Sequence, residues 1–156
     1  DLNPNIVETV ESLFTRIIGE PDIEGVTFSG GEPFLQAKSL GSLAAKLQNA
    51  GLSVVCYTGY TFEELMVRMD SETDLLLSKI DILIAGRFEA SVPADKLWVG
   101  SGNQEVLFLS SRYGDLRNRV HYGGREFEVQ IGSQGEMTVT GFFRPGIEDE
   151  LNGRIL

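Results

Sequence analysis

The sequence predicts an α/β protein built on a parallel β-sheet and followed by a C-terminal β-hairpin. Three apolar strand candidates alternate with helix candidates over residues 4–85, an order typical of parallel strands joined by helical crossovers. These strands are apolar without polar alternation, so we expect both faces of the sheet to be covered. Residues 126–131 and 137–142 instead alternate polar and apolar around a Gly-Ser-Gln-Gly turn, which predicts a hairpin with one buried face.

The individual elements are marked by capping residues and apolar periodicity. Asn3 can cap a first helix that starts at Pro4, and its apolar stripe continues to Ile18 before Gly19 ends it. Thr61 and Glu64 form the pattern of a capping box. The other candidates are strands at 25–29, 52–57, 81–85 and 105–110, a helix at 36–50, and a weaker helix start at 71–74.

Composition and charge limit the classes of function. The chain has 156 residues, 42% of them hydrophobic and 23% charged, which fits one globular domain. A net charge of -10 without a basic stripe argues against nucleic-acid binding. No apolar run is long enough to span a membrane and no secretory leader is visible, so we expect a cytoplasmic protein.

The chain has one cysteine, Cys56, and one histidine, His121. Together they cannot form an internal disulfide or a four-ligand zinc site, and no metal ligands are predicted within this chain. Cys56 lies inside a strand candidate, where we expect a buried core thiol. His121 lies in a polar, glycine-flanked stretch and is expected at the surface. No Ser/His/Asp set can be assembled around it.

The sequence Gly30-Gly31-Glu32-Pro33 directly follows the first strand candidate. In parallel sheets, ligands bind at the carboxyl ends of the strands, and two other loops, at 58–60 and from Gly86 onward, leave such ends. Glycines allow close backbone approach, and Glu32 adds a carboxylate, which suits a cationic amine better than a phosphate. Taken alone, this four-residue string is more typical of a tight turn between strand and helix.

Four segments resemble one family in the order of its motifs. Residues 26–36 resemble the Gly-Gly-Glu-Pro motif of radical S-adenosylmethionine (SAM) enzymes, whose loop binds the amino group of SAM. Residues 57–60, 81–88 and 98–104 resemble segments of the activating enzymes of anaerobic ribonucleotide reductase. The activating enzymes of pyruvate formate-lyase share the first motif.

The resemblance implies a partial (β/α) barrel that binds SAM and a [4Fe–4S] cluster. It also implies reductive cleavage of SAM to a 5′-deoxyadenosyl radical, a glycyl-radical enzyme as protein substrate, and an electron donor such as flavodoxin or ferredoxin. No catalytic side chain is assigned. The expected SAM-binding residues are Ser29, Gly30, Gly31, Glu32, Pro33, Thr58, Gly59 and Asn103.

The sequence departs from the family pattern at the cluster. The family holds its cluster with a Cys-x-x-x-Cys-x-x-Cys loop upstream of the first motif, but residues 1–25 contain no cysteine. We therefore expect an N-terminally truncated radical SAM-type domain over residues 1–110, inactive by itself, with residues 111–156 as an extension packed on it. Ala85 stands where these enzymes often have an acid, and Asp81 is expected to be a solvated acid at a strand start.

Two other interpretations stay open. The first is a non-catalytic binding module that has lost the cluster and retains a role in binding a protein or nucleotide. The second is an ordinary nucleotide-binding α/β domain, which is disfavoured because no Gly-x-Gly-x-x-Gly follows a strand.

Overall fold

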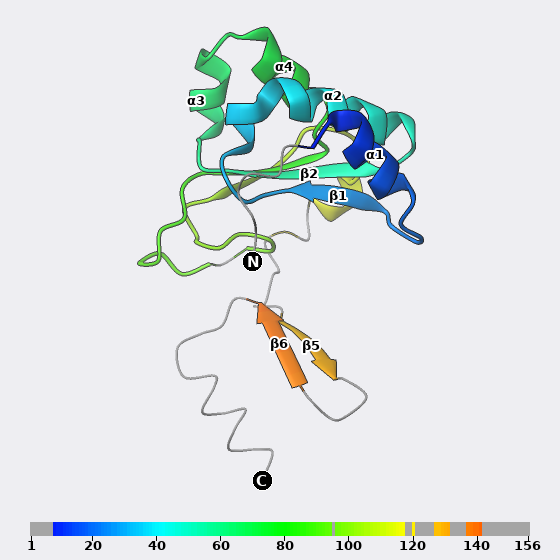
Figure 1. The fold of residues 1–156 in the computed structure, drawn as a ribbon. Helices are drawn as coiled ribbons and strands as arrows, with labels where there is room; N and C mark the ends of the chain where they lie inside the picture. Colours follow the sequence, from blue (N-terminus) through cyan, green and yellow to red (C-terminus); the bar gives the residue numbers. More distant parts are fainter. Residues whose placement is uncertain (1–7, 95, 118–119, 121–126, 132–136, 142–156) are drawn as a thin grey trace.

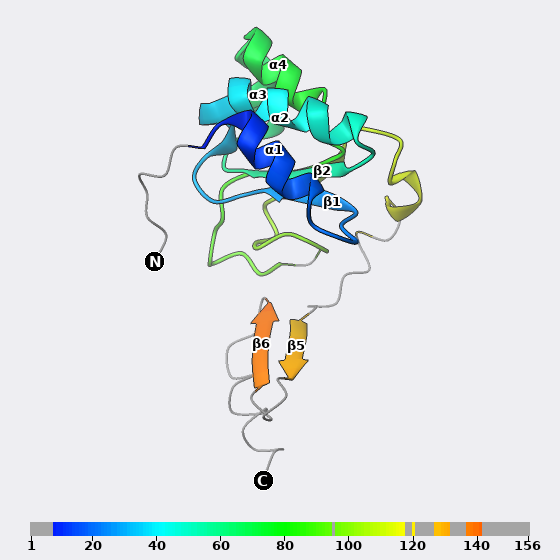
Figure 2. The same cartoon turned by 45° about the vertical axis from the view of Figure 1, so that its right-hand side comes forward.

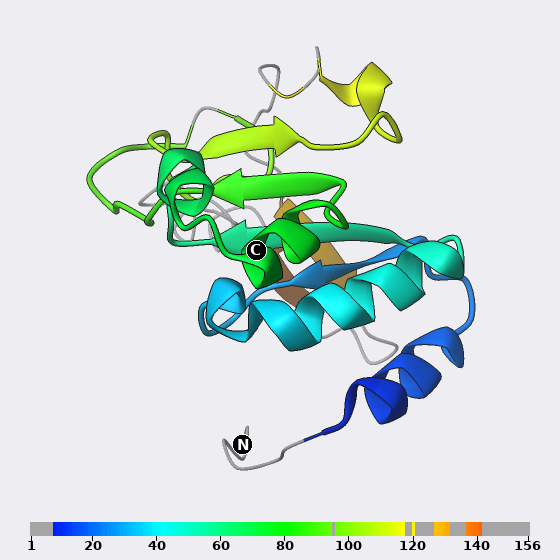
Figure 3. The ribbon, with the colours of Figure 1, turned by 90° about the horizontal axis from the view of Figure 1, so that it is seen from above.

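The computed structural model describes residues 8–94, 96–117, 120, 127–131 and 137–141. Its main sheet has four strands in the order β1-β2-β3-β4 (Figures 1 and 3). The first three strands are parallel, and β4 pairs antiparallel with β3. The predicted α/β class and parallel sheet are confirmed. The strands are β1 (Gly25–Phe28), β2 (Ser53–Thr58), β3 (Ile82–Ala85) and β4 (Glu105–Phe108).

The four α-helices of the described residues lie on one face of this sheet (Figures 1 and 2). Leu43, Leu47 and Leu76 are completely or almost completely buried against Cys56 and Leu83 of the sheet. Apolar burial of this kind is the main stabilising contribution to the fold. The helices are α1 (Val10–Ile18), α2 (Ala37–Asn49), α3 (Phe62–Val67) and α4 (Ser71–Leu77).

A loop rather than a helix covers the opposite face of the sheet. Val99 packs there on Ile82 and Ile84 of β3. The Trp98 ring meets Phe108 of β4 edge-on, with ring centroids 6.3 Å apart. Both faces are therefore covered as expected, but in the described part of the chain helices cover only one. The sequence pattern could not separate these cases, because burial on both sides makes a strand apolar whatever covers it.

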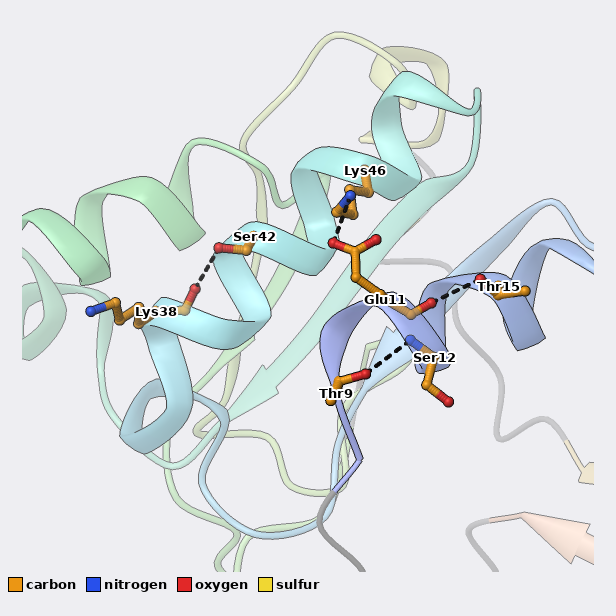
Figure 4. A network of polar contacts seen from close by, with 7 residues as sticks. All are labelled: Thr9, Glu11, Ser12, Thr15, Lys38, Ser42 and Lys46. Atoms are coloured by element: carbon orange, nitrogen blue, oxygen red, sulfur yellow. Dashed lines mark hydrogen bonds and ion pairs between the residues drawn. The ribbon is translucent and has the colours of Figure 1, made fainter.

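Helix α1 begins later than its sequence pattern predicted. Thr9 is its N-cap, and the Thr9 hydroxyl accepts a hydrogen bond from the Ser12 amide at 3.2 Å (Figure 4). The predicted start is therefore wrong for residues 8 and 9, and residues 1–7 lie outside the described part. An ion pair of 3.0 Å between Glu11 and Lys46 joins α1 to α2. The Lys46 ammonium also lies 5.6 Å from the centre of the Phe14 ring.

The caps of the two short helices follow the β2 segment. The predicted capping box of α3 is confirmed, with Thr61 and Glu64 each accepting a hydrogen bond from the other's amide. Asp70, one residue before the predicted signal, caps α4, and its carboxylate accepts from the Thr73 amide at 2.7 Å. Hydrogen bonds from Thr73 lower the pKa of Asp70, because they stabilise its charged form.

Asp81 is not the solvated acid that its position predicted. Only 3% of the residue is exposed. Its carboxylate accepts hydrogen bonds from the Val54 amide at 2.9 Å and from the Ser110 hydroxyl at 2.5 Å. Asp81 therefore joins β2 to the segment that follows β4, at the amino edge of the parallel strands and opposite the candidate site.

The predicted C-terminal hairpin is present as an antiparallel pair of β5 (Phe127–Ile131) and β6 (Met137–Gly141). The packing of residues 111–156 on the main domain stays a prediction, and His121 lies outside the described residues. Within the described part of the chain, no helix is long and apolar enough to cross a membrane.

Candidate functional site

The carboxyl ends of β1, β2 and β3 lie side by side and form one edge of the sheet. Phe28, at the end of β1, is paired with Cys56 of β2, and Thr58, at the end of β2, is paired with Ala85 of β3. Strand β2 thus extends two residues beyond the level of Phe28. The Gly-Gly-Glu-Pro loop can therefore reach the last residue of β2, and it does so through Glu32.

The Glu32 carboxylate joins the loops that follow β1 and β2. Its Oε1 atom accepts hydrogen bonds from the Thr58 hydroxyl at 2.8 Å and from the Phe34 amide at 3.0 Å. Its Oε2 atom accepts from the Gly59 amide at 2.8 Å. Both oxygens of this half-buried side chain are occupied by donors of the chain itself. Hydrogen bonds to an ionised acceptor are among the stronger ones in proteins.

The hydrogen-bonded connection continues to the third loop. The Thr58 hydroxyl accepts from the Tyr60 amide at 3.1 Å, and the Tyr60 carbonyl accepts from the Gly86 amide at 2.8 Å. The Gly86 carbonyl then accepts from the Gln104 side chain at 2.9 Å. Gly86 has a φ of 112°, which side chains rarely adopt, so glycine suits this junction. Three loops and the segment before β4 thus form one polar framework.

The two glycines of the first loop leave their backbone open. Gly30 and Gly31 are exposed, and a Cβ atom at either position would meet no atom within 4 Å. Gly30 has a φ of 81°, a conformation that favours glycine. Ser29 is exposed beside them, whereas Pro33 is buried at the start of the 3₁₀ helix Pro33–Gln36.

A hollow of about 250 Å³ lies directly beside this loop. The loop forms one wall with β1, and Leu13 and Ile17 of α1 line the hollow as well. Its volume is slightly below the range of pockets that enclose a drug-sized ligand. The hollow therefore has room for one end of such a ligand.

The side chains of Asn103 and Gln104 form hydrogen bonds with the third loop and not with the first. The Asn103 side chain donates to the Arg87 carbonyl at 2.8 Å and to the Glu89 carboxylate at 3.3 Å. Gln104 was not singled out from the sequence, although it is 7% exposed and its Oε1 atom accepts from two amides of the same loop, at 2.8 and 3.2 Å. A glutamine in a glycine-rich loop directly before a strand is the signal that could have identified it.

Two arginines stand beside these loops. The Arg68 guanidinium lies 4.7 Å from the centre of the Tyr60 ring, a cation–π arrangement. A Cβ atom at Gly59 would lie 4.0 Å from Cγ of Arg87. Among the described residues, neither arginine belongs to an ion pair within 4.0 Å. The carboxyl edge of the sheet therefore combines the Glu32 carboxylate, which already accepts hydrogen bonds from the chain, with the exposed side chains of Arg68 and Arg87.

Comparison with known proteins assigns these motifs to a family. The family described as a 4Fe-4S single cluster domain matches residues 3–107, which include the whole framework from Glu32 to Gln104. The chain belongs to this 4Fe-4S single cluster domain family.

A curated relative carries the name of an activating protein, which confirms the predicted resemblance to activating enzymes. The anaerobic ribonucleoside-triphosphate reductase-activating protein of Enterobacteria phage T4 is 29% identical over 104 residues. The aligned region covers 64% of this chain and 62% of the relative. No solved structure matches the chain.

The residues of this chain do not fit the cluster of this 4Fe-4S family. A [4Fe–4S] cluster takes three or four thiolates, and the sequence has one cysteine. Cys56 is completely buried in the core, and burial, with the nearby Glu32 charge, raises its pKa to about 12. Within the described residues, no group of three or more His, Cys, Asp or Glu could hold a metal ion.

Proposed function

We propose that this chain is the SAM-binding body of a radical-generating activase. The observation that carries the proposal is the Glu32 carboxylate, which joins the Gly-Gly-Glu-Pro loop to Thr58 and Gly59 at 2.8 Å each. This framework brings together two of the segments that resemble radical SAM activating enzymes and holds them at the carboxyl edge of a parallel sheet, where ligands bind in such folds.

We assign the contact with the SAM ammonium group to backbone carbonyls of residues 29–31. These residues are exposed, and their glycines leave space for close approach. Glu32 faces its own chain with both oxygens, so its role in this proposal is to hold the loop rather than to contact the amine. Thr58 and Gly59 fix the neighbouring loop, and Asn103 fixes the loop after β3.

The complete activity would be reductive cleavage of SAM to a 5′-deoxyadenosyl radical, followed by hydrogen abstraction from a glycine of a partner protein. The name of the phage T4 relative favours an anaerobic ribonucleoside-triphosphate reductase as that partner. The electron would come from a donor such as flavodoxin or ferredoxin. Because one cysteine cannot hold the cluster, we assign binding and orientation of SAM to these residues and no cleavage step.

Substitution of Gly31 provides the sharpest test of SAM binding. A Cβ atom at Gly31 meets no atom within 4 Å and the residue does not have a positive φ, so Gly31→Ala leaves the fold intact. If carbonyls of this loop contact SAM, the added methyl group obstructs that approach. We expect Gly31→Ala to weaken SAM binding about tenfold in equilibrium dialysis, a loss of about 1.4 kcal/mol.

Gly114→Ala is the matched control, because a Cβ atom there also meets nothing within 4 Å and the residue lies outside the framework. Its SAM affinity should equal that of the unchanged chain. Equal affinity of the Gly31→Ala variant would place SAM elsewhere. Failure of the unchanged chain to bind SAM would favour the alternative that the lone cysteine supports, a non-catalytic module.

A further inference from the structure

We infer that an exposed apolar patch beside the candidate site is the docking surface for the protein on which the activase acts. This rim patch consists of Leu35, Met66, Val67 and Met69. The inference rests on the proposed function for the identity of the partner. It adds the surface that would hold that partner against the site.

The side chains of the rim patch are far more exposed than apolar residues of this size usually are. Leu35 is 71% exposed, Val67 74% and Met69 87%, and Met66 is 55% exposed. Single exposed apolar residues are common, but a group of them indicates an interaction site. Leu35 lines a surface hollow of about 610 Å³ together with Arg68, which lies between Val67 and Met69 in the sequence, so this hollow connects Leu35 to the segment that carries the other three residues.

The rim patch lies at the same end of the molecule as the Glu32 framework. Leu35 follows the Gly-Gly-Glu-Pro loop directly, and α3 follows the loop of Thr58 and Gly59. Figures 1 and 3 show α3 and the start of α2 at the end where the arrowheads of β1, β2 and β3 lie. Phe88, which follows the end of β3, is 63% exposed. A protein seated on this end would cover the site.

Met69 adds an observation that does not depend on exposure. It has a φ of 50°, a left-handed conformation that asparagine or glycine adopts more readily than methionine. Neither burial nor backbone preference requires a long apolar side chain there. Such an outlier is often retained for function, and flexible methionines are frequent at binding surfaces.

Charge favours a partner with carboxylates around its apolar contact area. The chain carries a net charge of -10, yet Arg68 and Arg87 flank the framework and belong to none of the ion pairs among the described residues. Exposed arginines beside apolar anchors are typical of protein interfaces. A second copy of so acidic a chain is disfavoured by mutual repulsion at low ionic strength.

The test compares two variants of the full chain for binding to the anaerobic ribonucleoside-triphosphate reductase of the same organism. The first carries Leu35→Gln, Val67→Gln and Met69→Asn, all at positions more than 70% exposed. The second is the control Ile18→Gln, at the 49% exposed end of α1. We expect at least a tenfold higher Kd for the triple variant and a change within twofold for the control. SAM affinity should be unchanged in both.

Each result bears on a separate claim. Equal binding of the triple variant and the unchanged chain would overturn the rim patch while leaving the proposed function intact. A change confined to self-association, seen by sedimentation, would assign the patch to a second copy instead and overturn the inference. Absence of binding by the unchanged chain, with SAM binding retained, would overturn both the reductase partner and this surface.

Discussion

The Thr58 hydroxyl donates a hydrogen bond of 2.8 Å to Glu32, and this contact joins residues 26 positions apart in the sequence. The sequence predicted both side chains as SAM-binding residues. Their contact changes the function we assign to both. The pair closes the framework at the carboxyl edge of the sheet before any ligand arrives, which reduces the ordering cost of binding.

Glu32→Gln should destabilise the fold although it preserves the size of the side chain. A glutamine has one acceptor oxygen and an amide that cannot accept the bond from Gly59, so one donor loses its partner. We expect a loss of about 1–3 kcal/mol in the free energy of unfolding, measured with urea. Glu20→Gln is the control, because Glu20 is exposed and should change stability by less than about 0.5 kcal/mol.

Thr58→Val removes the hydroxyl from the same contact and permits a double-mutant cycle with Glu32→Gln. If the two side chains stabilise each other directly, the double variant should lose less stability than the sum of the single losses. We expect a coupling energy of about 0.5–3 kcal/mol. Strict additivity would show that the bond between Thr58 and Glu32 contributes little in solution.

Neighbouring residues Asn103 and Gln104 should respond very differently to truncation. Gln104→Ala leaves the Gly86 carbonyl and two loop amides without their partner in a buried site, so we expect a loss of about 3 kcal/mol or more. Asn103→Ala affects an exposed residue and should cost about 1 kcal/mol or less. Thermal unfolding of both variants checks the contrast, and equal losses would contradict it.

The alternation of helices and strands along the chain predicted the main architecture because its signals are local. The capping box of Thr61 and Glu64 and the apolar stripe of α1 depend on residues a few positions apart. The antiparallel direction of β4 and the loop cover of the second face depend instead on long-range packing, such as Trp98 against Phe108. No periodicity within one segment encodes such a choice.

The candidate site was predicted in its location but not in its connections. The glycines and Glu32 marked the loop after β1, and the parallel sheet placed that loop beside Thr58 and Gly59. The direction of the Glu32 carboxylate, toward its own chain, depends on β2 extending beyond β1 in the sheet. The burial of Asp81 likewise depends on Ser110, 29 positions later in the sequence.

By itself, this chain should hold no iron–sulfur cluster. After anaerobic incubation with iron and sulfide we expect far less than one iron per chain, because a single buried thiol cannot replace three or four exposed thiolates. Cys56→Ala should bind the same amount of iron as the unchanged chain. About four irons per chain, lost on Cys56→Ala, would contradict the conclusion that these residues do not fit the cluster.

Cys56 should make the fold less stable in alkaline solution. Its pKa is raised from 9.0 to about 12, by burial first and then by the charge of Glu32. Above about pH 9 the Cys56 thiol loses its proton in the unfolded chain but keeps it in the folded chain. Stability should therefore fall as pH rises from 9 toward 12, by at most about 1.4 kcal/mol per pH unit from this group.

Urea unfolding at pH 8, 9 and 10 isolates this contribution through the variant Cys56→Ala. The substitution lowers stability at every pH by opening a small cavity. It should also make the unfolding free energy fall less steeply between pH 9 and pH 10. Burial also raises the pKa of Tyr57, so the unfolding free energy of Cys56→Ala should still fall somewhat with pH. The variant Tyr57→Phe should keep the pH dependence that comes from Cys56. Equal slopes in the unchanged chain and in Cys56→Ala would mean that the folded thiol ionises as readily as the unfolded one. Cys56 would then be accessible to solvent, contrary to its complete burial in the core.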